Sequence, residues 1–591
     1  MNYLYRPSIL TVAISLCFSS LAAHAASPAA KKAAAKPAPQ TVLLQTMQTE
    51  LARAMQSLGH PAAGAAAVDA TAQPGPYFIS YDVADAYSTR IMAQYGALVN
   101  SSENHVRLGD IQVRVGSPAQ DNTHGTHRTS ALSTVSLPLE NDAEALGRSL
   151  WFATNRGYGT ALQNYLKVKT EQQVRAKEED TSPDFSVEAP VKGMETPLTP
   201  ETVDRKAWEA RVRALSASLR AYPDVFFDAV ILSSDTENDY YVSSEGSVTI
   251  APTQLARLVI VARTRADDGM DLFRTLTYEA RSLSGLPATE KLNADIAEVG
   301  KSLEALRVAP LTQPFRGPAI LSGRAAAVFF HEVLGHRLEG QRQRGDEEGQ
   351  TFTKDVGKAI LPSFLSVADD PTLSTFHGTE LSGHYLYDDE GEPARHVDLI
   401  QDGVLKTFLM SRMPVKNFAN SNGHGRAQTG KLPTGRQGNL IVTSSKTVSD
   451  TELRAMLIAE AKKQGKPYGL FFQDISSGFT LTQRMLPQAF SVVPLVVYRV
   501  YVDGRPDELV RGVSIVGTPQ SALNHIVATD DNPQVFNGEC GAESGTVPVS
   551  AVAPGMLVSE IETEKQKQGT ARPPILPPPT ADAAPAAKEV R

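Results

Sequence analysis

Three residues with the chemistry of a metal-dependent hydrolase lie close together in VFFHEVLGHRLEG, the stretch from Val328 to Gly340. His331 and His336 offer imidazole nitrogens, which are common zinc ligands, and Glu332 offers a carboxylate that can take a proton from water. The spacing is H-E-x-x-x-H, one residue longer than the familiar H-E-x-x-H helix motif. The first question is therefore whether both imidazoles can reach one metal ion.

The helix that carries these residues is expected to be irregular. Ser322 is a good N-cap, and GRAAAVFFHEVLGH after it has the pattern of a helix. On a regular α-helix, residues five apart lie about 140° apart around the axis, which is poor for one metal. A wider turn, as in a π-bulge, or a bend would bring them together, and Gly335 has the backbone freedom that such a distortion needs. Glu332 can then act as general base for water that the metal activates.

A hydrogen-bonded polar strip on a core helix is the alternative interpretation of this stretch. The run AAAVFF before the motif looks core-facing, and an ionised Glu332 and two imidazoles inside a core would need partners, which favours a metal. A catalytic zinc usually takes three protein ligands and a water. Glu339 is near in sequence and fits a second-shell bond equally well. The candidate third ligands are Glu339, Asp355, His377, His384, His424 and Cys540.

The N-terminus has the pattern of a secretory signal peptide. A short positive region containing Arg6 precedes an apolar segment from Ile9 to Leu21, and Ala23-His24-Ala25 matches a cleavage site. The apolar segment is too short to span a bilayer comfortably, and no later stretch is long enough. We therefore expect an exported protein without a transmembrane anchor, cut near Ala25, with the periplasm as the expected compartment.

Export makes the cysteine count informative. The chain has two cysteines, Cys17 and Cys540, and cleavage removes the first. A lone thiol in an oxidising compartment is best explained if it is buried or bound to a metal. Cys540 lies in FNGECGAESGTVPVS, and the glycines around it predict a tight loop that can bring a thiolate close to a metal. The alternative is an inert buried cysteine.

Length and composition predict a multidomain globular protein. The chain has 591 residues, 41% of them hydrophobic and 21% charged, and its net charge of -8 gives no basic footprint for nucleic acid. We expect no nucleic-acid partner. The predicted organisation is a signal peptide (1–25), an Ala/Pro/Lys-rich spacer (26–40), an N-terminal α+β domain (41–309), a C-terminal domain with the motif (310–565) and a disordered Pro/Ala-rich tail (566–591).

Periodicity predicts an α+β fold whose second half is rich in strands. Helices are expected over residues 40–59, 143–177, 204–222 and 289–307, with antiparallel strands over 76–116 and a linker or surface loop over 178–204. After the motif helix, most segments have strand patterns, among them YLYDDEGEPARHVDLIQDGVLKTFLM, GLFFQDIS and FSVVPLVVYRVYVDG. Asp402-Gly403 predicts a hairpin turn.

Several of these motifs together resemble the TldD/PmbA family of metallopeptidases. The resemblance rests on HEVLGHRLEG, YDDEG (387–391), DGVLKTFLMSR (402–412), NGHGR (422–426) and GECGAESGTVPV (538–549), in that order. It covers residues 310–565 and is weaker over 40–310. The intact H-E-x-x-x-H is similar to the catalytic, TldD-like branch, because the non-catalytic partner branch lacks it.

The resemblance implies a zinc-dependent peptidase that cleaves peptides or unfolded proteins and forms a homodimer, or a heterodimer with a family partner. It implies that His331, His336 and Cys540 bind Zn²⁺ and that Glu332 is the catalytic base. His424 and Arg426 are candidate substrate-binding residues, with a glycine-stabilised turn as the alternative. Two other functions stay open: a non-catalytic assembly subunit with a structural zinc, and another metal-assisted amide hydrolase.

Overall fold

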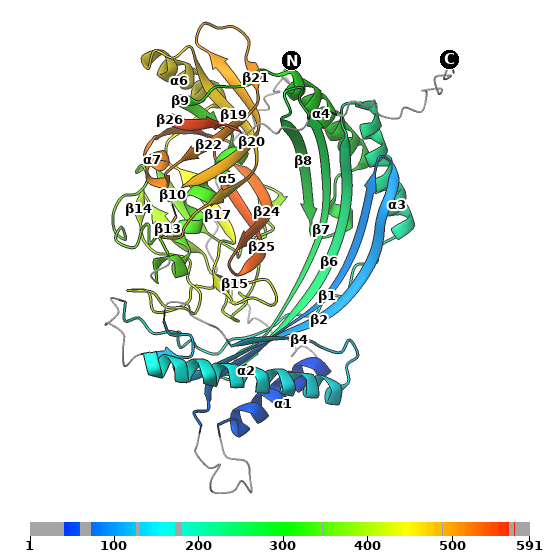
Figure 1. The fold of residues 1–591 in the computed structure, drawn as a ribbon, viewed down its shortest axis with the longest axis vertical. Coiled ribbons are helices and arrows are strands. Elements are labelled where there is room, and N and C mark those ends of the chain that lie inside the picture. The colour runs from blue at the N-terminus through cyan, green and yellow to red at the C-terminus, as the bar shows by residue number, and fades with distance from the viewer. Residues whose placement is uncertain are drawn as a thin grey trace, which may run out of the picture. The chain divides into compact units, whose positions relative to one another are not determined.

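Four long strands form the framework of the first half of the chain in the computed structural model (Figure 1). They are β1 (Pro76–Gln94), β2 (Ala97–Ser117), β6 (Phe227–Ser243) and β7 (Val248–Arg265). With β3 (Gln120–Asp121), β4 (Leu132–Ser136), β5 (Lys192–Met194) and β8 (Asp271–Ala280) they make an eight-stranded sheet along the path β3-β2-β1-β6-β7-β5. The structure describes residues 41–59, 73–125, 131–171, 180–344, 348–486, 489–566 and 572–573.

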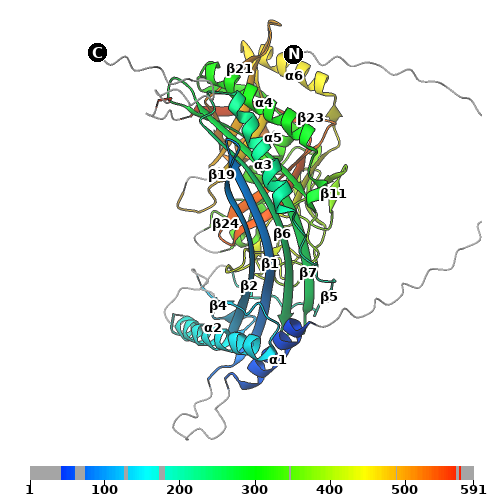
Figure 2. The same cartoon turned by 90° about the vertical axis from the view of Figure 1, so that its right-hand side faces the viewer.

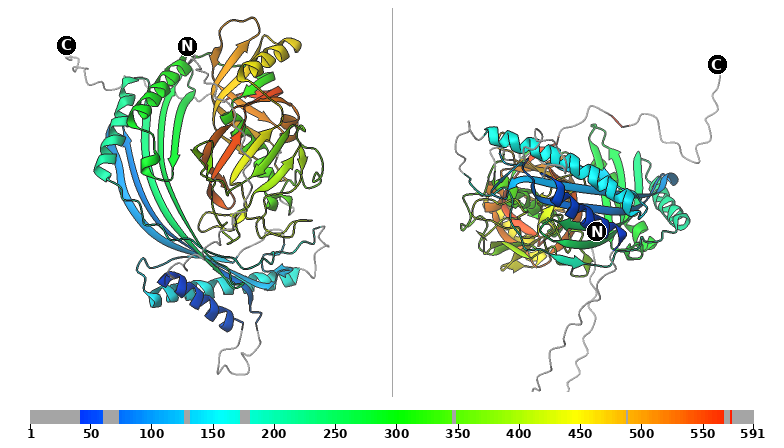
Figure 3. Two further views of the ribbon diagram at one scale, coloured as in Figure 1. Left: turned by 180° about the vertical axis from the view of Figure 1, so that it is seen from behind. Right: turned by 90° about the horizontal axis from the view of Figure 1, so that it is seen from below.

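One face of this sheet packs against helices at both of its ends. Ile79, Tyr81 and Val83 on β1 share a core with helices α1 (Val42–Ser57) and α2 (Ala143–Glu171). Ile91 and Ala93, further along β1, share a second core with α3 (Arg205–Ser218) and α4 (Thr289–Val308). Figures 2 and 3 show the two helix pairs on the outer side of the curved strands. Since successive side chains alternate between faces, the other face is left for the second half of the chain.

Two further sheets make up most of the second half. The first runs in the order β14-β13-β10-β17-β25-β24. Its strands are β10 (Leu365–Asp369), β13 (Val397–Gln401), β14 (Val404–Leu405), β17 (Asn439–Ser444), β24 (Gln534–Ala542) and β25 (Gly545–Ala553). β24 ends the order and pairs with β25 over its whole length. It is therefore an edge strand among the described residues.

The second of these sheets closes on itself. Its order is β18-β23-β26-β22-β20-β19-β9, and β26 also pairs with β9. The strands are β9 (Phe315–Leu321), β18 (Thr447–Val448), β19 (Tyr468–Thr480), β20 (Phe490–Tyr501), β21 (Glu508–Val510), β22 (Val513–Gly517), β23 (Ile526–Asp530) and β26 (Met556–Lys565). Helices α6 (Asp450–Lys463) and α7 (Pro519–Asn524) and the short pairs β11–β12 (Thr375–Phe376, Thr379–Glu380) and β15–β16 (Gly425–Arg426, Thr434–Gly435) complete this half.

Helix α5 (Gly323–Val333) is the element that carries the motif, and it is buried between the two sheets of the second half. Ala325, Phe329 and Val333 belong to the same core cluster as strand residues of both sheets. A helix that is apolar on nearly every side is stable only when it is enclosed in this way. Ser322 caps it as predicted, since its side chain accepts a hydrogen bond from the backbone N–H of Ala325.

The α+β class and the strand-rich second half are confirmed, with local differences. The predicted loop over 178–204 contributes β5, which pairs in parallel with β7. The Asp402-Gly403 hairpin is confirmed, and both residues have positive φ, as the tight turn requires. YDDEG is a loop rather than a strand, with the carboxylate of Asp388 accepting backbone N–H groups of Glu390 and Glu392.

Three of the predicted segments lie outside the described residues. They are the signal peptide, the Ala/Pro/Lys-rich spacer and nearly all of the Pro/Ala-rich tail. The described residues form one compact unit, and the division into domains at residues 309 and 310 stays a prediction. Among the described residues, none of the helices combines the length and the apolar character needed to cross a membrane.

Candidate metal centre and its cleft

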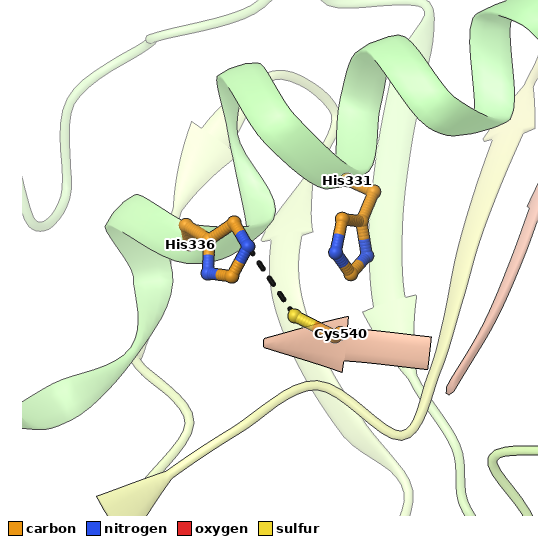
Figure 4. A group of neighbouring side chains, drawn as sticks. All are labelled: His331, His336 and Cys540. Atoms are coloured by element: carbon orange, nitrogen blue, oxygen red, sulfur yellow. Dashed lines mark hydrogen bonds between the residues drawn. The ribbon is translucent and has the colours of Figure 1, made fainter. Parts of the chain in front are cut away.

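The structure brings His331, His336 and Cys540 together at one point. A nitrogen of each histidine and the sulfur of Cys540 all lie within 4.8 Å of one another, and all three residues are buried. His336 Nε2 is 3.3 Å from Cys540 Sγ, and the two imidazole rings are 4.9 Å apart at their centroids (Figure 4). Two imidazoles and a thiol that converge at this range have the donor set of a zinc site.

A break in the helix solves the spacing problem. Helix α5 ends at Val333, and a 3-10 turn covers Gly335–Leu338, so His331 and His336 belong to different helical segments. The expected distortion is thus a bend. Gly335 lies at this break but does not use the left-handed conformation, since its φ is not positive. A Cβ at Gly335 would lie 2.0 Å from Gln437 Oε1, so the glycine is needed for close approach of this side chain.

The expected loop around Cys540 is also corrected. Cys540 lies inside strand β24, paired with Val547 of β25, and the turn of the hairpin comes after Ala542. The glycines therefore flank a strand position. A side chain in a strand has a fixed direction, and here it points toward the end of α5 (Figure 4).

Glu339 contacts Nδ1 of His336, the ring nitrogen that is not directed at Cys540. Its Oε1 is 3.0 Å from His336 Nδ1, and its Oε2 accepts a hydrogen bond from Arg342 Nε at 2.7 Å. Burial alone raises the pKa of Glu339, but the positive charges of His336 and Arg342 lower it to about 2. An ionised carboxylate only accepts, so Nδ1 of His336 carries the proton and Nε2 is directed at Cys540. Glu339 thus orients a ligand.

Within the cluster, the pKa values of Cys540 and His336 are shifted in opposite directions. Burial raises the pKa of the Cys540 thiol, but the positive charges of His336 and His331 outweigh it and hold that pKa well below the usual range. Burial lowers the pKa of His336, while the charges of Cys540 and Glu339 raise it well above the usual range. A thiolate is the form of cysteine that binds a metal.

Sequence reasoning missed Arg436, which ties the two ligand segments together. Its side chain is fully buried, with Nη2 donating to the Cys540 carbonyl at 2.6 Å and Nη1 to Ser544 Oγ at 2.8 Å. Its Nε lies 3.4 Å from Glu339 Oε1. Nothing in the local pattern of GRQGN marks Arg436, because its partners are about a hundred residues away along the chain in both directions.

Replacing Arg436 is expected to destabilise the protein strongly. In Arg436→Met the buried Cys540 carbonyl loses its donor and the Glu339 carboxylate loses a nearby positive charge, and we expect the free energy of unfolding to fall by about 3 kcal/mol. Urea denaturation measures this. Arg454→Met is the matched control, since the Arg454–Asp507 ion pair is partly exposed and worth less than about 1 kcal/mol. An equal loss in both variants would contradict the assigned role of Arg436.

A cleft of 750 Å³ opens on the cluster. One wall is the first sheet, where Arg257 and Val259 of β7 and the alternate residues Thr275, Thr277 and Glu279 of β8 line it. These residues lie on the face that the helices leave free. The other walls are β24, residues 476–483 of β19 and the turn after it, and α5 with Val328, His331 and Glu332. The cleft is therefore built from both halves of the chain.

Ion pairs connect the first sheet to β24 and β19, the two strands beside the metal centre. Arg257 pairs with Glu539, the residue before Cys540, and also with Glu279. Arg274 Nη1 lies 3.2 Å from Asp474 Oδ2 on β19. These contacts set the position of the first sheet across the cleft.

Glu332 faces this cleft from the end of α5. Its Oε2 is 4.0 Å from His336 Nε2, and burial raises the pKa of its carboxyl group. A Cβ on Gly478 of β19 would lie 2.5 Å from Glu332 Cγ, so β19 packs directly against the Glu332 side chain. Glu332 is thus held beside the cluster by backbone on its far side.

The remaining candidate residues lie elsewhere. His424 is fully buried with Nε2 3.2 Å from Asp369 Oδ1, and Arg426 donates to the carbonyls of Gln437 and Pro548. Neither is among the described residues that line the cleft, and their role in substrate binding stays a prediction. Asp355, His377 and His384 do not join the cluster.

Residues 314–565 match the family model described as the PmbA/TldA metallopeptidase C-terminal domain. The chain is 26% identical over 253 residues to the metalloprotease TldD homolog of Haemophilus influenzae, covering 41% of this chain and 47% of that protein. It thus spans about half the length of that relative. It is 24% identical over 365 residues to the zinc metalloprotease TldD homolog of Saccharolobus solfataricus, covering 60% of this chain and 73% of the relative.

The fold also has a close counterpart among solved structures. The crystal structure of TldE from Thermococcus kodakarensis superposes with a TM-score of 0.54, covering 83% of this chain and 97% of that one. The sequence identity is 14%, so this likeness concerns the fold alone.

Proposed function

Because this chain belongs to the TldD/PmbA metallopeptidase family, we propose that it is a zinc-dependent peptidase that hydrolyses peptides or unfolded proteins. One observation carries the proposal: His331, His336 and Cys540 converge to within 4.8 Å and line a cleft together with Glu332.

The residues of the cluster fit a zinc ion. The thiol has a strongly lowered pKa, His336 is oriented through Glu339, and the name of the S. solfataricus relative includes zinc. His331, His336 and Cys540 would hold the ion, which leaves one position of a four-coordinate site open to the cleft. When bound there, zinc acts as a Lewis acid: it lowers the pKa of water, so that a hydroxide nucleophile is available at neutral pH, and it polarises a carbonyl group.

Glu332 is the general base in this proposal. Its carboxylate accepts a proton from the attacking water and passes it to the leaving amine nitrogen. Its raised pKa suits the first half of this transfer, because a more basic carboxylate is the better acceptor. The backbone of Gly478 limits where the carboxylate can lie, so Gly478 is a positioning residue.

Gly478→Ala is expected to lower kcat by about 10²-fold, because the new methyl group displaces the Glu332 side chain from its reacting position. Zinc content should stay unchanged. Gly541→Ala is the matched control: Gly541 follows Cys540, and a Cβ there meets nothing nearer than Thr546 Oγ1 at 3.9 Å. Steady-state kinetics with zinc analysis test this. A loss of zinc in Gly478→Ala would show that the glycine supports the metal ligands instead.

The edge strand β24 supports a preference for extended substrates. It carries Cys540, lines the cleft and pairs on one side with β25. An extended peptide can add to such an edge through backbone hydrogen bonds, which a folded protein cannot supply. This geometry favours peptides and unfolded chains over folded proteins.

A structural zinc in a non-catalytic subunit is the alternative function. Such a site is normally closed by four protein ligands. Among the described residues the cluster contains three metal-binding side chains, and it opens on the cleft. This favours the peptidase. The edge strand β24 beside the cleft is the feature that favours a peptidase over another amide hydrolase.

Export and assembly complete the proposal. The N-terminal pattern supports an exported, periplasmic enzyme. Pairing with a second family member, as a homodimer or a heterodimer, is the assembly that the resemblance to the TldD/PmbA family implies.

Metal removal tests the proposed function. Purified mature protein should cleave an unstructured polypeptide such as reduced, carboxymethylated lactalbumin, lose this activity on dialysis against a chelator, and regain it with zinc but not magnesium. Native lactalbumin is the matched substrate control and should be spared. Protein that holds zinc and leaves the unfolded chain intact would favour the structural alternative.

A further inference from the structure

The end of β19 and the turn after it expose large apolar side chains that line the cleft. Phe479 is 56% exposed and Leu486 is 41% exposed, and both line the same cleft as His331, Glu332 and Cys540. Exposed apolar groups gathered in a cavity mark a place where another molecule binds, because water is released when they are covered. Met485 is 91% exposed in the same turn and is not part of the cleft lining.

The pairing of β19 with β20 determines where Phe479 points. Gly478 pairs with Val492 and Thr480 with Phe490, and these two β20 residues are buried in the core. Gly478 and Thr480 therefore face α5 and the 3-10 turn after it, where the first touches Glu332 and the second accepts from Arg337. Phe479 lies between them and projects from the opposite face of the strand. It stands one residue from the position that packs on the catalytic base.

The lining of the cleft contains both apolar and charged residues. Val259 of β7 and the buried Leu495 of β20 line it together with Phe479 and Leu486. Its charged side chains next to β24, Arg257, Glu279 and Glu539, are occupied with one another. A charged substrate side chain against the Phe479 ring would lose hydration, whereas an apolar side chain would have little hydration to lose.

Resting on the proposed peptidase function, we infer that Phe479 and Leu486, with Val259 and Leu495, form a subsite for a large apolar side chain of the substrate near the cleaved bond. The occupant is aliphatic or aromatic. A substrate whose side chain fills an apolar subsite has a kcat/KM about 10-fold or more above that of a substrate that leaves the subsite empty. The enzyme would thus select sites in the apolar segments that folded proteins bury.

A matched pair of peptides tests this subsite. Both are unstructured Gly/Ser/Lys peptides of the same length and charge, with Phe at one central position in the first and Ser in the second. With the zinc-loaded wild-type protein we expect kcat/KM to be about 10-fold higher for the Phe peptide. We also expect cleavage of the Phe peptide at a constant distance from the Phe residue.

Variants of the turn region separate this subsite from general effects. Phe479→Ala and Leu486→Ala should bring the ratio of kcat/KM for the two peptides close to one, while Met485→Ala, in the same turn, should leave it unchanged. All three residues are exposed, so the thermal midpoint of each variant should match the wild type. A ratio of one in the wild type, or a ratio that survives in Phe479→Ala, overturns the subsite and leaves the peptidase proposal standing.

A binding measurement keeps the subsite testable without turnover. The zinc-loaded Glu332→Gln protein should bind the dye-labelled Phe peptide about 10-fold more tightly than the Ser peptide, by fluorescence anisotropy, and Phe479→Ala in that background should remove the difference. If the wild type cleaves neither peptide, the peptidase proposal fails, and this binding ratio alone decides the subsite. Equal binding of both peptides overturns it.

Discussion

Glu332→Gln should lower kcat for an unfolded substrate by about 10³-fold, while the protein keeps its fold and about one zinc per chain. The amide has nearly the same size as the carboxylate, so packing against Gly478 is preserved. It cannot accept a proton from water, which removes the general base. Single-turnover kinetics together with metal analysis by mass spectrometry measure both quantities on the same sample.

The matched control for this variant is Glu348→Gln. Glu348 also lines the cleft, and it pairs with Arg342 at 3.6 Å rather than approaching the metal cluster. The same chemical change there should alter kcat only slightly. If Glu332→Gln keeps full activity, Glu332 is not the base, and the amide hydrolysis must use another group or not occur at this site.

Cys540→Ser should remove most of the zinc and with it the activity. A serine hydroxyl fills nearly the same space, but it stays protonated at neutral pH and is a poor zinc ligand, whereas the thiol of Cys540 has a strongly lowered pKa. We expect about one zinc per chain in the wild type and a marked loss in the variant, measured by mass spectrometry after equilibration with a weak competing chelator.

Glu339→Gln provides a graded comparison for the cysteine variant. Glu339 touches His336 Nδ1 and not the open side of the cluster, so its replacement should weaken zinc affinity by about 10- to 100-fold rather than abolish binding. Wild-type zinc content in Cys540→Ser would overturn the assignment of the thiol as a ligand. A wild-type protein without zinc, in contrast, would leave His331 and His336 to be explained as a polar strip on a buried helix.

Local sequence was enough to predict the elements that carry the first half of the site. The Ser322 N-cap, the apolar run before His331 and the H-E-x-x-x-H spacing depend on neighbours within a few residues, and the structure has the helix where these patterns put it. The spacing also required a distortion between His331 and His336, because five residues of regular helix cannot align two side chains. What kind of distortion occurs was not decided locally: it is a bend, and Gln437 packs against Gly335 there.

The tertiary structure decided which residues from distant segments of the chain meet at the site. Cys540 lies 204 residues from His336 and sits in a strand, so no local periodicity marks it as the third member of the cluster. Arg436, Gly478 and the residues of β7 and β8 across the cleft belong to the site only through packing of sheets from both halves of the chain. His424 shows the converse, since a histidine in a glycine-rich motif proves to be buried against Asp369. Residue type determines which chemistry a side chain can do, but contacts between sheets determine which side chains meet, because hydrogen-bond pairing and core packing act between segments far apart in sequence.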